Sequence, residues 1–118
     1  MKTILVVDDD PDLQEALADL LESRGYRVSS AEDGAKALQW LGESEAPGLI
    51  LLDLMMPVMD GHEFLARRNA DPVLAEIPVV VISAGRHPGG SVLAGAAEVL
   101  YKPFEADHLI GIVQRFCG

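Results

Sequence analysis

Four consecutive apolar residues, Leu49-Ile50-Leu51-Leu52, run directly into Asp53. Uninterrupted apolar runs of this length are typical of strands that are covered on both faces, as in parallel sheets. A carboxylate just after such a strand lies at the carboxyl edge of the sheet, where open α/β folds bind their ligands. Asp53 can also simply end the strand or begin a turn, because Asp is common in both places. The chemistry of the other strand ends decides between these interpretations.

Strand-like and helix-like segments alternate along the whole chain. Helical patterns fall between short apolar or β-branched runs, so we expect an α/β fold with right-handed crossovers and a doubly wound parallel sheet that has helices on both faces. The strands are predicted at Ile4–Val7, Tyr26–Ser30, Leu49–Leu52, Val79–Ile82 and Val99–Tyr101.

Capping residues and apolar spacing predict the helices. The first begins after Asp10 and stops at Gly25, the second runs from Asp33 to Gly42, the third begins near Asp60, and the last spans about 105–116. Residues 84–98 are rich in Gly and contain a Pro, so the fourth helix of such a fold is expected to be short or irregular. Leu13, Ala16, Leu17, Leu20 and Leu21 are expected to share one face of the first helix, and Arg67 and Arg68 to face solvent.

Composition restricts the class of protein. At 118 residues the chain has the length of one domain, and no linker or repeat divides residues 1–118. Nine Lys and Arg residues against 19 Asp and Glu give a formal net charge of −10, which argues against unaided nucleic-acid binding. Cys117 is the only cysteine, so no internal disulfide is expected. We find no signal peptide or transmembrane stretch, so we expect a cytoplasmic protein without membrane insertion.

The predicted strand ends carry complementary chemistry. The first strand leads into Asp8-Asp9-Asp10, the third into Asp53, the fourth into Ser83 and the fifth into Lys102. These ends meet at one edge of a parallel sheet, where crowded carboxylates repel one another unless a cation joins them. Hard oxygen ligands with room for water suit Mg²⁺ or Mn²⁺. A lysine and a hydroxyl beside that metal can hold a phosphoryl group, which a carboxylate can accept as an aspartyl phosphate.

The sequence resembles the receiver domain of two-component response regulators, the phospho-acceptors of sensor histidine kinases. The resemblance covers the whole chain, and its motifs occur in the right order. It implies a flavodoxin-like five-stranded sheet of order 2-1-3-4-5, in a domain similar to the chemotaxis regulators. Because the last expected helix ends at about residue 116 of 118, we expect no attached output domain, and the chain is either a stand-alone receiver or a fragment of a longer protein. The matching segments are Ile4–Asp10, Asp53–Gly61, Val81–Ala84, Gly95–Ala96 and Lys102–Phe104.

The resemblance also implies how the acidic residues act. Asp53 would be the phosphorylated nucleophile. Asp8, Asp9 and Asp53, together with the backbone carbonyl of Met55, would bind Mg²⁺. Asp10 is the weaker match, and its position favours capping the first helix over binding the metal.

Ser83 and Lys102 complete the implied site. Ser83 would donate a hydrogen bond to the phosphoryl group, and Lys102 would neutralise one of its oxygens. The Lys102–Pro103 peptide is expected to be cis. The implied partners are a sensor histidine kinase or phosphotransfer protein and a downstream protein target. The domain would be a signalling phospho-acceptor that catalyses only its own phosphorylation and dephosphorylation.

Two departures from the family pattern keep other functions open. The aromatic residue usually found three positions before the lysine is replaced by Val99, with Tyr101 two positions later, and the stretch from Ser83 to Gly95 is about one helical turn short. Both departures are compatible with a phosphorylation-independent scaffold. A phosphohydrolase of the haloacid-dehalogenase type is a further alternative, although such enzymes usually have a second Asp where this chain has Met55.

Overall fold

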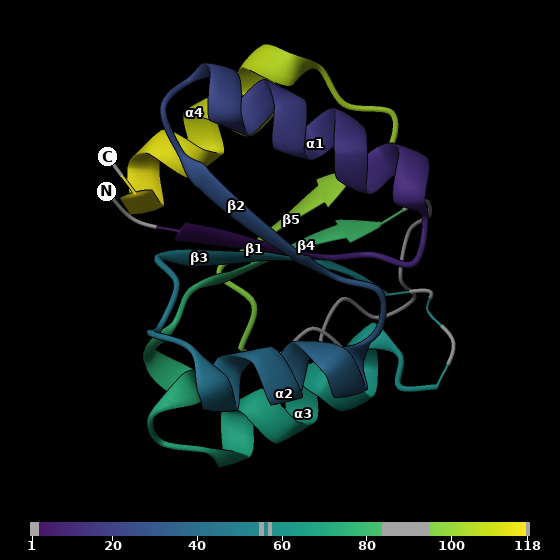
Figure 1. Cartoon of the computed structure of the whole chain (residues 1–118), viewed down its shortest axis with the longest axis vertical. Helices are drawn as coiled ribbons and strands as arrows, with labels where there is room; N and C mark the ends of the chain where they lie inside the picture. The colour runs from purple at the N-terminus through teal and green to yellow at the C-terminus, as the bar shows by residue number, and fades with distance from the viewer. Residues whose placement is uncertain (1–2, 55, 57, 84–94, 118) are drawn as a thin grey trace.

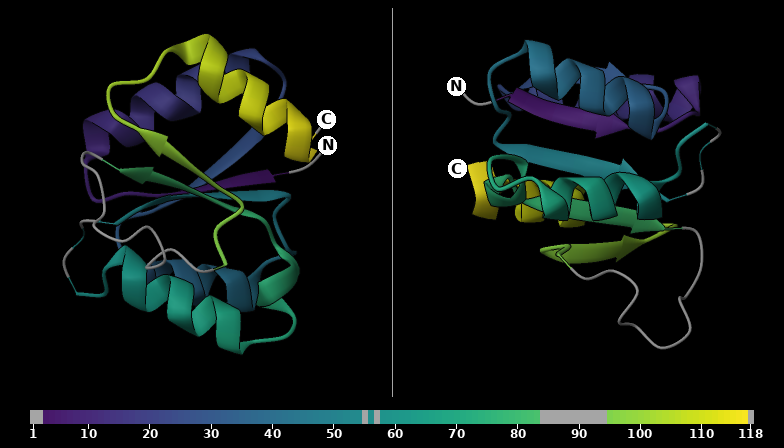
Figure 2. Two further views of the ribbon diagram at one scale, coloured as in Figure 1. Left: turned by 180° about the vertical axis from the view of Figure 1, so that it is seen from behind. Right: turned by 90° about the horizontal axis from the view of Figure 1, so that it is seen from below.

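Five parallel strands form a single sheet in the order β2-β1-β3-β4-β5, as the resemblance implied. The computed structural model describes residues 3–54, 56, 58–83 and 95–117. The arrowheads of the strands point in one direction (Figure 2), so all carboxyl ends lie at the same edge. Every predicted strand is confirmed to within one residue: β1 (Thr3–Val7), β2 (Arg27–Ala31), β3 (Leu49–Asp53), β4 (Val79–Ser83) and β5 (Glu98–Tyr101).

Helices cover both faces of the sheet (Figure 1). One face carries α1 (Pro11–Ser23) and α4 (Ala106–Cys117), and the other carries α2 (Gly34–Glu43) and α3 (Gly61–Ala70). A 3₁₀ turn, η1 (Leu74–Glu76), precedes β4 and was not predicted. The prediction of a short fourth helix falls on residues 84–94, which lie outside the described residues. None of the helices in the described ranges combines the length and apolar character that a membrane span requires.

Alternating side chains of the central strands fill two separate cores. In β1, Ile4 and Val6 pack toward α1 and α4, whereas Leu5 and Val7 pack toward α2 and α3. Strand β3 divides in the same way, and all five of its residues are buried. This two-sided burial explains why the sequence of β3 has no polar alternation before Asp53.

Aspartates begin three of the helices at the carboxyl edge of the sheet. Asp10 accepts a hydrogen bond from the backbone N–H of Asp12, and Asp33 and Asp60 accept from residues in the first turns of α2 and α3. Caps of this kind contribute about 1 kcal/mol each. The three predicted helix starts are therefore confirmed, and each helix begins close to the strand ends that carry the candidate site.

Three predictions about the helices were wrong in detail. Gly42 lies inside α2, which ends at Glu43, because a glycine that keeps helical angles does not end a helix. Ala16 is exposed, while Leu17 and Leu21 are buried on the inner face of α1. Arg68 was expected in solvent but is only 6% exposed.

Arg68 connects α3 to the amino edge of the sheet. Its guanidinium group donates to the carbonyl oxygens of Ile77 and Gly95, at 2.6 and 3.0 Å, and to Oδ1 of Asn69 at 2.8 Å. Ile77 leads into β4 and Gly95 precedes β5. Gly95 has a φ of +94°, and a Cβ atom there would lie 2.3 Å from the Asn69 side chain. The segment entering β5 is thus held closely against the end of α3.

Candidate functional site

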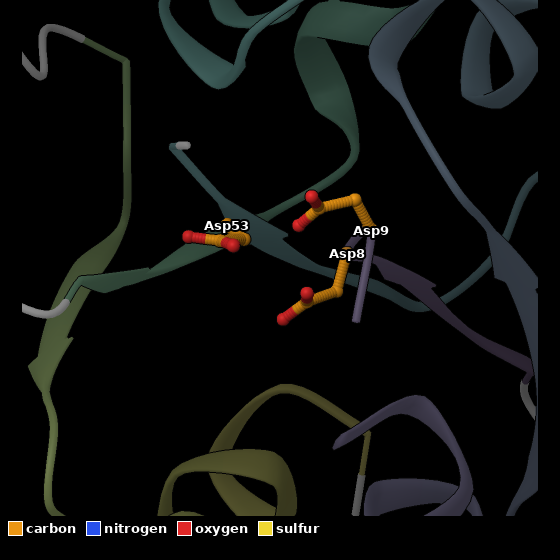
Figure 3. Close-up of side chains that lie close together, drawn as sticks. All are labelled: Asp8, Asp9 and Asp53. Atoms are coloured by element: carbon orange, nitrogen blue, oxygen red, sulfur yellow. The ribbon is translucent and has the colours of Figure 1, made fainter. Parts of the chain in front are cut away.

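Three carboxylates gather where β1 and β3 end. One oxygen each from Asp8, Asp9 and Asp53 lies within 4.8 Å of the others, and Figure 3 shows Asp8 and Asp9 beyond β1 beside Asp53 at the end of β3. Asp8 and Asp53 are buried, whereas Asp9 is exposed. The strand register explains the meeting, because β1 and β3 are direct neighbours and Val7 is paired with Leu52.

Burial and the neighbouring carboxylates shift the ionisation of Asp8 at this edge of the sheet. Burial is the main reason why the pKa of Asp8 rises from 3.8 to about 6, and the nearby charges of Asp53 and Asp9 raise it further. A backbone hydrogen bond from Asp10 to Asp8 Oδ1, at 2.9 Å, and the charge of Lys102 act in the opposite direction. On balance, the carboxyl group of Asp8 keeps its proton to a higher pH than a free aspartate does. A bound cation would favour the ionised form.

The donor set fits a small divalent cation. The carboxylate oxygens of Asp8, Asp9 and Asp53 lie within 4.8 Å of one another, close enough for the three groups to share one cation as oxygen ligands. Oxygen ligands without sulfur or imidazole favour a hard ion. Met55, whose carbonyl was predicted as a further ligand, lies outside the described residues.

Ser83 and Lys102 lie on the same edge, on the far side of Asp53 from β1. Ser83 is the last residue of β4 and is buried. The backbone N–H of Lys102 donates to the carbonyl oxygen of Ser83 at 2.8 Å, which joins the ends of β4 and β5. The side chain of Lys102 is half-buried and close enough to Asp8 to lower its pKa. The Lys102–Pro103 peptide is cis, as predicted.

Two glycines lie close to Asp53, Leu54 and Met59, which are among the described residues at and after the end of β3. Gly61 donates to the carbonyl oxygen of Leu54 at 3.0 Å, and a Cβ atom on Gly61 would lie 2.5 Å from the carbonyl oxygen of Asp53. Gly34 donates to the carbonyl oxygen of Met59, also at 3.0 Å. Both helices on this face therefore begin against residues that follow β3. Among these, Val58 is 85% exposed and has a φ of 65°, a strained conformation for a β-branched residue.

Two contributors to the site were missed from the sequence. The contact of Gly34 with Met59 could not be predicted, because in the sequence Gly34 is simply a glycine that follows the capping residue Asp33. Gln14, on α1, donates through Nε2 to the carbonyl oxygens of Asp8 and Ala31. A glutamine in a helix is normally a solvent-facing residue, so no local pattern marks this contact.

The chain has relatives throughout one family. Residues 4–114 match the response regulator receiver domain. The DNA-binding dual master transcriptional regulator RpaA of Synechocystis sp. is 36% identical over 97% of this chain, and the matched part is 48% of RpaA itself. The chain thus spans about half the length of this relative.

Solved structures give the same result. The receiver domain of sensor histidine kinase PA1611 from Pseudomonas aeruginosa PAO1, with a magnesium ion coordinated in its active site cleft, has a TM-score of 0.87 and 31% identity over 98% of this chain and 96% of its own. The response regulator TrrA from Thermotoga maritima, in complex with Mg²⁺ and BeF, has a TM-score of 0.88 and 30% identity over 98% and 99%. With the same strand order and an acidic cluster at the carboxyl edge, this chain belongs to the response regulator receiver domains of two-component systems.

Proposed function

We propose that this domain accepts a phosphoryl group on Asp53, from a phosphohistidine of a sensor histidine kinase or phosphotransfer protein, and thereby switches its protein contacts. The observation that carries the proposal is the gathering of Asp8, Asp9 and Asp53 oxygens within 4.8 Å. Such a cluster costs folding free energy. Its retention beside a lysine is explained by the need to bind a cation and an anion together.

The residues divide the chemistry between them. Asp8, Asp9 and Asp53 would hold Mg²⁺, with the Met55 carbonyl as a further ligand. When bound, the ion supplies positive charge that stabilises the oxygens of the transferring phosphoryl group. An oxygen of Asp53 attacks phosphorus as the P–N bond to histidine breaks, and the histidine nitrogen keeps the electron pair and takes up a proton. Lys102 balances the charge on a second phosphoryl oxygen.

Ser83 would convert the new charge into a change of shape. The phosphoryl group adds strong acceptor oxygens at the end of β3, and the buried hydroxyl of Ser83, which directly follows the β4 residue paired with Asp53, would donate a hydrogen bond to one of them. A shift of Ser83 is passed directly to Lys102 through their backbone hydrogen bond. Water attack on phosphorus then releases inorganic phosphate and restores the Asp53 carboxylate.

The assignment of Asp53 is tested by phosphate uptake. The parent protein, with Mg²⁺ and acetyl phosphate as donor, is expected to gain one phosphoryl group in intact-protein mass spectrometry, whereas Asp53→Asn gains none. Asp60→Asn is a matched control, because Asp60 is an exposed cap after the same strand and Asn also caps helices. Equal uptake by Asp53→Asn and the parent protein would overturn the assignment.

The switch itself is tested separately with beryllofluoride, a stable mimic of the phosphoryl group. Val99 occupies the position where the family usually has an aromatic residue and is packed against the core, while Tyr101 is 47% exposed, so a phosphorylation-independent scaffold is the competing function. We expect amide shifts at Asp9, Asp53 and Ser83 that extend into β5 in NMR spectra. Shifts confined to the carboxylates would indicate a phosphate carrier, and no response would indicate a phosphorylation-independent scaffold.

A further inference from the structure

The side-chain amide of Gln14 links the acidic cluster to the edge strand β2, and both of its acceptors are backbone carbonyl oxygens. Its Nε2 atom donates to the carbonyl oxygen of Asp8 and, at 3.1 Å, to that of Ala31, the last residue of β2. The same Ala31 oxygen accepts the backbone N–H of Asp8 at 3.0 Å. A side-chain amide has two N–H donors, and Gln14 uses its amide to join Asp8, the residue after β1, to Ala31, the last paired residue of β2.

This contact controls a particular peptide plane. The carbonyl group of Asp8 and the N–H of Asp9 belong to one rigid unit, so a donor on the Asp8 oxygen also fixes the direction in which the chain carries Asp9. Asp9 is the exposed member of the cluster. It has less packing than Asp8 or Asp53 to hold it against the repulsion of two neighbouring carboxylates.

The first turn of α1 completes the same arrangement. The carboxylate of Asp8 accepts the N–H of Asp10 at 2.9 Å, and the carboxylate of Asp10 accepts the N–H of Asp12 at 3.0 Å. Asp8 is therefore held at its side chain by Asp10 and at its carbonyl by Gln14. The start of α1 and the end of β1 form one hydrogen-bonded unit, in which Gln14 supplies the contact to β2.

We propose that Gln14 is a positioning residue for the divalent cation: it sets the Asp8–Asp9 peptide so that both carboxylates face Asp53 before the ion binds. The inference rests on the proposed function, because it assumes that these carboxylates hold Mg²⁺. Without Gln14 the cation must order this peptide as it binds, and its affinity falls. Partners that orient metal ligands typically change metal affinity 10- to 100-fold when removed, and we expect about tenfold for this one.

The experiment compares Gln14→Met with Gln39→Met. Both changes replace the same amide with an unbranched apolar chain on a helix. Both residues line the same cavity of about 380 Å³, between α2, the end of β2 and the start of α1, but only Gln14 contacts Asp8. The dissociation constant of Mg²⁺ is measured by NMR titration of backbone amides, and the melting temperature is measured without Mg²⁺. Gln14→Ala serves as a second variant, since alanine favours the helix.

We expect both Gln14 variants to bind Mg²⁺ about tenfold more weakly, with the amide shift of Asp9 displaced in the metal-free protein, while Gln39→Met keeps the parent affinity. A lower melting temperature with unchanged Mg²⁺ affinity would mean a purely structural role and would overturn the proposal, as would equal losses in the Gln14 and Gln39 variants. Phosphate uptake is scored independently by mass. A parent protein that binds Mg²⁺ in a Gln14-dependent way but takes up no phosphate overturns only the proposed function, and one that binds no Mg²⁺ overturns both.

Discussion

The two edges of the sheet bury charge in opposite ways. At the carboxyl edge, Asp8 and Asp53 are buried beside each other and beside Asp9. At the amino edge, Arg68 is equally buried, yet two of its nitrogens donate to three oxygens of the protein, two of them main-chain carbonyls. The acidic edge gathers like charges, whereas the basic edge pairs both terminal nitrogens of a single guanidinium group with neutral acceptors and leaves its buried Nε without a hydrogen-bond partner among the described residues.

This is the difference expected between a cation-binding site, as proposed for the acidic edge, and a structural connection such as that of Arg68. Buried charge without a counter-charge is costly unless hydrogen bonds or an ion offset the loss of water. Arg68 obtains its hydrogen bonds from the fold itself, by joining α3 to the segments that enter β4 and β5. At the acidic edge the carboxyl group of Asp8 instead feels both the like charges of Asp53 and Asp9 and the opposite charge of Lys102, an arrangement that an added cation would stabilise.

The strongest test of the comparison is to replace Arg68, whose terminal nitrogens are hydrogen-bonded within the fold. Arg68→Met is expected to lower the free energy of unfolding by about 3 kcal/mol, because it leaves the buried carbonyl oxygen of Ile77 and the partly buried one of Gly95 without this donor. Urea denaturation measures the change. Arg67→Met is the matched control: Arg67 is the adjacent residue, exposed, and paired with Glu63 on the helix surface, so its loss is expected to change stability by about 0.5 kcal/mol or less. Equal effects of the two variants would show that Arg68 is not a structural connection.

Helical periodicity predicts that Arg68 is buried, although arginine as a residue type is usually exposed. Arg68 follows Phe64 by four positions and Leu65 by three, so helical periodicity alone places it on the buried face. Arginine was expected in solvent because burying its charge normally needs an anionic partner. The partners here are carbonyl groups from residues 9 and 27 positions away, and no local pattern predicts where they come to lie.

The acidic edge, by contrast, was predictable in outline. Parallel strand ends meet at one edge regardless of side-chain detail, which is why the order of strands and helices alone predicts that Asp8, Asp9 and Asp53 lie together. The capping role of Asp10 followed from residue type and position. The Gln14 contact, the close approach of Gly61 to Asp53 and the positive φ of Val58 depend on exact backbone placement. Propensity carries no information of that kind.

The second test uses pH and acts on the acidic edge. The folded protein raises the pKa of Asp8 from 3.8 to about 6, mainly through burial. Between about pH 4 and pH 6 the folded state therefore keeps a proton that the unfolded chain has released, and stability falls as pH rises through this window. We expect a loss of about 2 kcal/mol attributable to Asp8, in buffer without divalent ions.

Asp8→Asn isolates this contribution. Asparagine keeps an oxygen that can accept the N–H of Asp10 but cannot ionise, so the variant is expected to be more stable than the parent protein above about pH 6 and to lose the part of the pH dependence due to Asp8. Denaturant unfolding of both proteins between pH 4 and pH 7.5 measures the difference. If their stabilities ran parallel across this range, the carboxyl edge would not store the electrostatic cost that distinguishes it from the amino edge.

The prediction with the smallest expected effect tests whether the two edges of the sheet act independently. Mg²⁺ at ten times its dissociation constant is expected to stabilise the folded protein by about 1.4 kcal/mol, since it binds the folded site and not the unfolded chain. Because Arg68 lies at the opposite edge of the sheet, Arg68→Met should gain the same increment from Mg²⁺ as the parent protein. Asp9→Asn, which removes a carboxylate from the cluster, should gain less than either. A Mg²⁺ increment that changed in Arg68→Met would mean that the Arg68 connection also shapes the metal site. The buried arginine at one edge of the sheet and the carboxylates at the other would then be energetically coupled.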